Sequence, residues 1–69
     1  MIKIKIQTNV IDSTGRAESF IVLLDDEKFS LLQDEIQNNN DNHLIQITDE
    51  HLRIYYVKNS SIKYIQVLD

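Results

Sequence analysis

The side chains best suited to binding a partner are three cations and one aromatic ring on predicted strands. Lys3 and Lys5 alternate with isoleucines near the N-terminus, and Arg53 and Tyr55 share one strand face because they lie two residues apart. Cations pair with phosphates, and aromatic rings stack on bases. These four residues predict a contact surface for an acidic protein or for single-stranded nucleic acid. The alternative interpretation is a solvated sheet face whose lysines discourage edge-to-edge pairing.

A second charged surface is predicted on a helix. Asp34 and Glu35 lie on the polar side of the amphipathic segment 26–38, and other acidic residues lie in the predicted turns. The chain has 11 Asp and Glu against 7 Lys and Arg, which gives a net charge of −4. That balance repels a polyanion at long range and disfavours nucleic acid as the partner. An acidic helix face suits a basic site on another protein better.

The sequence has no convincing signature of catalysis or of metal binding. The absence of cysteine excludes a disulfide and a thiolate metal site. His43 and His51 flank a predicted turn, but a spacing of eight residues matches no common zinc pattern. A chain whose only glycine is Gly15 cannot build a glycine-rich phosphate-binding loop. We therefore expect a non-catalytic protein that needs neither a cofactor nor a metal.

Hydrophobic periodicity predicts two strands in the first third of the chain. Residues 1–11 alternate between apolar and polar side chains, which is typical of a half-buried strand. Residues 12–15 have the composition of a turn, and residues 16–24 form a second segment rich in strand-forming side chains. The short connection between the two segments favours a hairpin.

One helix is expected next. Phe29, Leu32 and Ile36 recur at the spacing of an apolar helix face, which predicts a helix over residues 26–38. Either of the two aspartates at its start can cap the helix by accepting a hydrogen bond from a free amide. The run of asparagines after the helix is expected to end it, with one asparagine in the left-handed conformation in place of glycine.

Three short strands are predicted after the helix, over residues 43–48, 51–57 and 62–68. Their short connections favour a meander of antiparallel hairpins. The order β-β-α-β-β-β predicts an α+β fold, namely a small bent antiparallel sheet with one helix packed on it. We expect residues 1–69 to form a single domain.

The last two predicted strands are apolar on both faces, which is more than one short helix can cover. Either the sheet curls into a small barrel, or a second copy of the chain or another protein covers its other face. A domain of 69 residues without disulfides has a small core, and this favours self-association. The residues expected to meet a second copy are Tyr55, Val57, Ile65 and Val67.

Together these features predict a self-associating protein-binding module of adaptor or inhibitor type. The alternative is a barrel-like module that binds single-stranded nucleic acid through its basic and aromatic sheet face. No segment approaches the ~20 apolar residues of a membrane-spanning helix, and the N-terminus lacks the apolar run of a signal peptide. We therefore expect a cytoplasmic protein. Its richness in Ile and Asn is typical of an AT-rich genome, where an accessory protein of a low-GC bacterium or its phage would fit.

Overall fold

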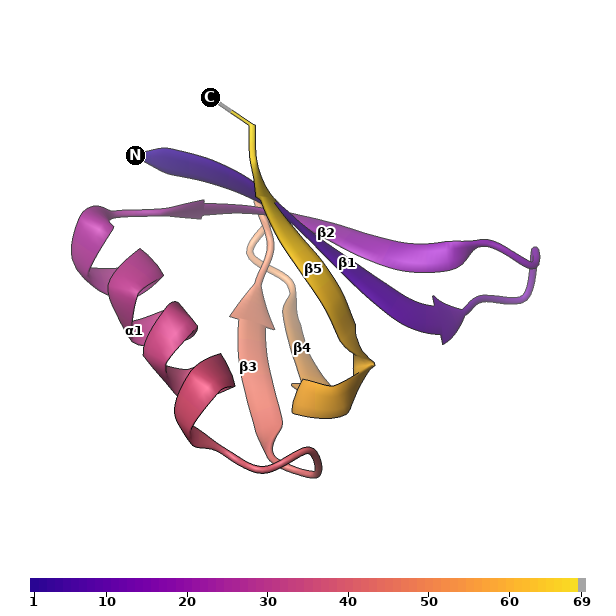
Figure 1. Ribbon diagram of the computed structural model, residues 1–69. Helices are drawn as coiled ribbons and strands as arrows, with labels where there is room; N and C mark the ends of the chain where they lie inside the picture. Colours follow the sequence, from indigo (N-terminus) through magenta and orange to yellow (C-terminus); the bar gives the residue numbers. More distant parts are fainter. Residues whose placement is uncertain (69) are drawn as a thin grey trace.

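The computed structural model describes residues 1–68 as two antiparallel sheets with one α-helix between the second and third strands (Figure 1). The elements in chain order are β1 (Ile2–Ile11), β2 (Ala17–Leu24), α1 (Asp26–Asn38), β3 (Leu44–Thr48), β4 (Ile54–Lys58), the 3-10 helix η1 (Asn59–Ser61) and β5 (Ile62–Val67). This order confirms the predicted α+β class. Within residues 1–68 no helix is both long enough and apolar enough to cross a membrane.

The larger sheet has the strand order β2-β1-β5, so β1 is its central strand. Ile6 of β1 lies opposite Phe20 of β2 on one side and Ile65 of β5 on the other. The predicted meander is therefore wrong at its last step, because β5 pairs with β1 and not with β4. The reason is the connection: η1 takes the place of a tight hairpin turn, and the segment has no glycine for such a turn.

The smaller sheet is the hairpin of β3 and β4, in which Ile45 lies opposite Val57 and Ile47 opposite Tyr55. Its first strand matches the prediction closely, but β4 begins at Ile54, three residues later than expected. The preceding residues form a turn instead of extending the strand. The described strands make two separate sheets, so the barrel considered from the sequence is not formed.

The core lies between the two sheets and α1. Its buried members come from β1, β2, α1 and β3, and they are Ile4, Ile6, Phe20, Val22, Leu32, Ile45 and Ile47. Ile4 and Ile6 of β1 are completely buried, as the alternation of that segment predicts. Figure 1 shows the β3–β4 hairpin below the crossing of β1 and β5, with α1 beside β3 and the tip of the β1–β2 hairpin projecting away from them.

Helix α1 has the predicted bounds, and its apolar stripe packs on the core. Leu32 is buried there, while Phe29 and Ile36 are half-buried against the same cluster. Asp25 caps the first turn, since its Oδ1 accepts a hydrogen bond from the amide of Lys28 at 2.7 Å. The N-terminal cap is therefore confirmed.

The C-terminal end of α1 is stabilised differently from the prediction. Asn39 has φ −118° and ψ 161°, which is extended backbone, so the expected left-handed asparagine cap is wrong. Side chains satisfy the last carbonyls instead. The Nδ2 of Asn39 donates to the carbonyl of Glu35, and the Nδ2 of Asn59 donates to the carbonyl of Ile36, both at 2.8 Å. Because Asn59 belongs to η1, this contact also ties the helix end to the β4–β5 connection.

Candidate binding surfaces

The four residues of the predicted basic and aromatic patch lie on different faces. Lys3 and Lys5 are on the outer face of the three-stranded sheet, because they alternate with the buried isoleucines of β1. The ring of Tyr55 contacts the ring of Phe20, which faces inward from β2. Arg53 lies just before β4. The three-stranded sheet therefore separates the two lysines from Arg53 and Tyr55, and no single surface contains all four.

Three of the four residues expected to meet a second copy are used inside the domain. Tyr55, Val57 and Ile65 are half-buried and pack against the core cluster. Val67, opposite Ile4 on β5, is about half exposed. The two sheets pack on each other, and this packing covers much of the apolar surface of β4 and β5 that was expected to need a partner.

A different apolar face is left open on the β3–β4 hairpin. Leu44, Ile54 and Tyr56 keep 53%, 57% and 65% of their surface exposed. The hairpin register places Tyr56 opposite Gln46 and Ile54 opposite Thr48, so the three apolar side chains are neighbours on one face. We call this the outer hairpin face, made of Leu44, Gln46, Thr48, Ile54, Tyr56 and Lys58. The sequence predicted that this strand is apolar on both faces, but it did not indicate which of the two faces is exposed.

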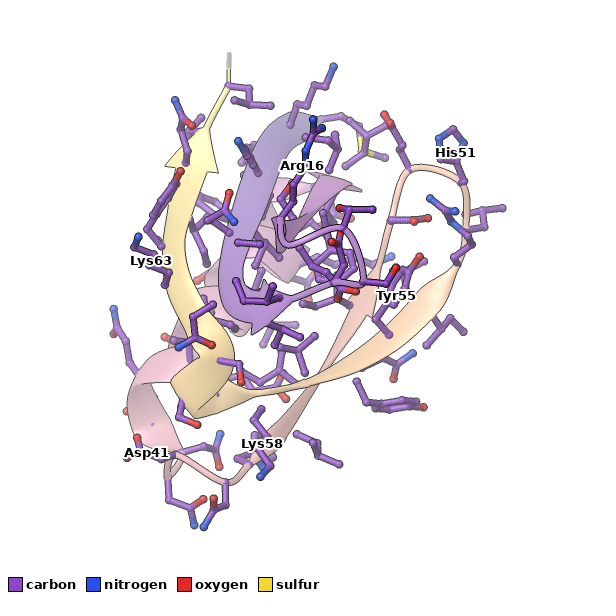
Figure 2. All side chains as sticks on the ribbon, turned by 90° about the vertical axis from the view of Figure 1, so that its right-hand side faces the viewer. Arg16, Asp41, His51, Tyr55, Lys58 and Lys63 are labelled. Carbon is purple, nitrogen blue, oxygen red and sulfur yellow. The ribbon has the colours of Figure 1, made fainter. Side chains whose placement is uncertain are left out.

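The two acidic residues predicted on α1 have different surroundings, since one is exposed to solvent and the other contacts a histidine of the same chain. Asp34 is exposed, whereas the Oε1 of Glu35 lies 3.0 Å from the Nε2 of His43. His43 and His51 lie beyond opposite ends of β3. Figure 2 shows His51 at the top of the molecule and Asp41, two residues before His43, at the bottom. Within residues 1–68 no group of three His, Asp or Glu side chains could hold a metal ion.

Asp49 organises the turn that leads from β3 to β4. Its Oδ1 accepts hydrogen bonds from the amides of His51 and Arg53, and its Oδ2 accepts one from Arg53 Nε at 2.8 Å. Asp49 as a whole residue is only 6% exposed. Burial raises the pKa of Asp49, but the hydrogen bonds from Arg53 and His51 and the positive charge of Arg53 outweigh it and hold the pKa below the ordinary 3.8. The sequence signal for this turn, an aspartate followed by polar residues, identified only a turn at 49–50.

The same turn presents an unusual leucine. Leu52 has φ +64°, the left-handed region that a leucine rarely adopts, and its side chain is 82% exposed. It lies on the rim of a groove of about 640 Å³ between the end of β2, α1 and β3. The apolar residues lining this groove include Val22 and Ile47 of the core.

A second groove of about 420 Å³ runs along β2. We call it the edge groove. It lies between residues 16–21 on one side and residues 49–55 on the other, and its lining includes Phe20 and Tyr55. Arg16, Tyr55 and His51, which are labelled in Figure 2, all line this groove. The predicted residues Arg53 and Tyr55 therefore do share a site, but their neighbour is Arg16 and not the two lysines.

Comparison of the chain with protein-family models, with curated proteins and with solved structures finds no match. Any functional conclusion must therefore come from the surfaces of this molecule.

Proposed function

We propose that this domain is a non-catalytic protein-binding module that self-associates through the outer hairpin face. The observation that supports the proposal is the exposure of Leu44, Ile54 and Tyr56 side by side on a two-stranded sheet. Isolated apolar residues on a protein surface need no explanation, but a contiguous group of them is typical of an interaction site. Tyr56 has one of the three side chains, tyrosine, tryptophan and arginine, in which residues that dominate binding energy are enriched.

A second copy of the chain is the occupant that fits this face best. A two-stranded sheet is marginal by itself, and a domain of 69 residues buries a small core, so covering the hairpin adds stability where it is most needed. The face contains Lys58 and no acidic residue. Two copies can therefore meet there by a two-fold axis without placing carboxylates of these acidic chains against each other.

Analytical ultracentrifugation over a concentration series tests this proposal. We expect the wild type to sediment as a dimer at high concentration, and Tyr56→Lys to sediment as a monomer. Tyr64→Lys is the matched control, because Tyr64 is also an exposed strand tyrosine but lies on the three-stranded sheet. A wild type that stays monomeric throughout contradicts the proposal. Equal dissociation of the two variants contradicts the choice of face.

The wider role that we propose is that of a cytoplasmic accessory protein of adaptor or inhibitor type, from a low-GC bacterium or its phage. The exposed acidic part of α1 around Asp34 supports a basic site on the target protein, because opposite charges steer association. The nucleic-acid alternative has less support, since its two lysines lie on a different face from Arg53 and Tyr55. Two cations on one face make a weak phosphate-binding surface.

A further inference from the structure

Strand β2 is an edge strand, and the direction of its backbone polar groups can be read from two contacts. The carbonyl of Ile21 accepts a hydrogen bond from the amide of Glu50 at 3.0 Å, so the polar groups of Ile21 point away from β1. The carbonyl of Glu18 accepts one from Thr8 Oγ1 at 2.8 Å, on the β1 side. Backbone groups alternate in direction along a strand. The amide and carbonyl of Ser19 therefore point outward, as those of Ile21 do.

The outward groups of Ser19 face the edge groove. This groove is lined by every residue from Arg16 to Ile21, and its far wall is the turn organised by Asp49. Its volume of about 420 Å³ lies within the range of ligand-binding clefts, roughly 300–1,000 Å³. From Ala17 to Phe20, before the carbonyl of Ile21 that bonds Glu50, the strand extends roughly 10 Å at its usual rise per residue. That length matches a peptide of about four residues in extended conformation.

The lining of the edge groove adds side-chain contacts to this backbone edge. Phe20 and Tyr55 form an aromatic pair that an apolar side chain of a ligand can cover. Arg53 binds Asp49 through Nε, and its side chain remains mostly exposed, so its terminal nitrogens can donate to carbonyl oxygens. Arg16 supplies a second guanidinium at the other end of the groove. Four carboxylates, those of Asp12, Glu18, Asp49 and Glu50, line the groove with these two guanidiniums, which suits a ligand without net negative charge.

We propose that the edge groove binds an extended peptide segment of a partner protein, which adds to β2 as a further strand of the three-stranded sheet. An extended peptide is the ligand class whose amides and carbonyls repeat with the same period as those of β2. This inference rests on the proposed function, protein binding, because its ligand is a segment of another protein. It uses a different surface from the outer hairpin face and is tested separately.

The first experiment uses two synthetic pentapeptides on the wild-type protein. Both have the sequence Thr-Val-Thr-Val-Thr with blocked ends; one is N-methylated at its two valines and the other at its three threonines. The amides of alternate residues face opposite sides of a strand, so each peptide lacks donors on one side only. We expect only one of the two to give saturable amide shifts and slowed hydrogen exchange at Ser19 in NMR titrations. Equal binding of both, or no shift at Ser19 with either, overturns the proposal.

The second experiment removes the outward amide from β2. Ser19→Pro deletes a donor that does not bond to β1, and proline is tolerated at such edge positions. Leu23→Pro is the matched control, because Leu23 has the same outward direction but lies outside the edge groove. For the unmethylated pentapeptide we expect affinity to fall about tenfold or more with Ser19→Pro and to be retained with Leu23→Pro. If Ser19→Pro does not fold, the pair of methylated peptides still decides the question.

The two proposals fail in distinguishable ways. The titration is repeated on Tyr56→Lys, which removes the proposed dimer but leaves the edge groove intact. Unchanged peptide binding by this variant supports the edge groove whatever the oligomeric state. Hydrogen exchange of the Ser19 amide could also slow without peptide as the protein concentration rises. That result would show that a second copy of the chain occupies β2, and it would overturn the peptide proposal. Shifts confined to Tyr56 and its neighbours would overturn it as well.

Discussion

The rings of Phe20 and Tyr55 lie with their centroids 4.5 Å apart and their planes tilted by 46°. This contact joins β2 of the three-stranded sheet to β4 of the hairpin, two strands that share no backbone ladder. Phe20 is buried and Tyr55 half-buried in the same cluster. Side-chain packing of this kind therefore holds the two sheets in their relative orientation, and it also forms part of the edge groove.

Replacing Tyr55 should weaken the packing between the sheets. We expect Tyr55→Ala to lower the free energy of unfolding by about 2 kcal/mol, because it removes a half-buried ring and an aromatic pair. Tyr55→Phe keeps the ring and should change the stability little. Urea denaturation followed by circular dichroism measures both. Tyr64→Ala, at an exposed position, is the control; a loss for Tyr55→Ala no larger than for this control would contradict the role of the pair.

The turn carboxylate of Asp49 should make stability depend on acid. Because its pKa is held below 3.8 in the folded protein, the unfolded chain takes up the proton first as the pH falls. The stabilisation is therefore present at neutral pH and is lost progressively from about pH 5 downward, through the lowered pKa. Melting temperatures between pH 7 and pH 3 should show this decline in the wild type.

Asp49→Asn should lower the melting temperature at pH 7 and flatten the decline with acid, since the titrating group is gone. Asp34→Asn changes the net charge equally at an exposed helix position and serves as the control.

The Asp12 turn contributes to the acid response in the same direction. Hydrogen bonds from the Thr14 hydroxyl, then from the amides of Arg16 and Thr14, lower the pKa of Asp12. Parallel curves for Asp49→Asn and the wild type would contradict the assignment to Asp49.

The left-handed conformation of Leu52 should cost stability that glycine recovers. That conformation costs a leucine roughly 1–2 kcal/mol, and glycine avoids this cost. Glycine in turn loses about 0.5–1 kcal/mol on folding, because it has greater conformational freedom in the unfolded chain. We expect Leu52→Gly to raise the free energy of unfolding by about 0.5 kcal/mol or more in urea denaturation. Leu52→Ala distinguishes the effect of the side chain from that of the backbone, because it shortens the exposed side chain but keeps the strain of the left-handed backbone. A stability gain from Leu52→Ala equal to that from Leu52→Gly would refute the backbone explanation.

The side chain of Asn59 should stabilise the end of α1. Asn59→Ala removes the donor to the Ile36 carbonyl, and we expect a loss of about 1 kcal/mol together with faster amide exchange in the last helical turn. Asn42→Ala is the control, because Asn42 is an exposed asparagine of the adjacent loop. Unchanged exchange in the last turn of α1 would show that Asn39 alone caps the helix.

The sequence by itself determined the elements whose signal is local. The alternation of residues 1–11 predicted β1 with Ile4 and Ile6 inward, and the apolar spacing over residues 26–38 predicted α1, with a cap from one of two aspartates that proves to be Asp25. In both segments only one face is apolar, so periodicity leaves a single way to orient the element against a core. The α+β class followed from the order of these elements.

Only the tertiary structure decided the partner of β5 and the inward face of β4. Tyr55 and Tyr56 are adjacent and chemically identical, so strand parity cannot say which of them is buried. The pairing of Ile47 with Tyr55, and the packing of Tyr55 on Phe20, turn Tyr55 inward and leave Tyr56 in solvent. These are contacts between residues far apart in the chain, which no local pattern encodes. They also place Arg53 beside the edge of β2 instead of beside Lys3 and Lys5, and so determine where this domain can bind.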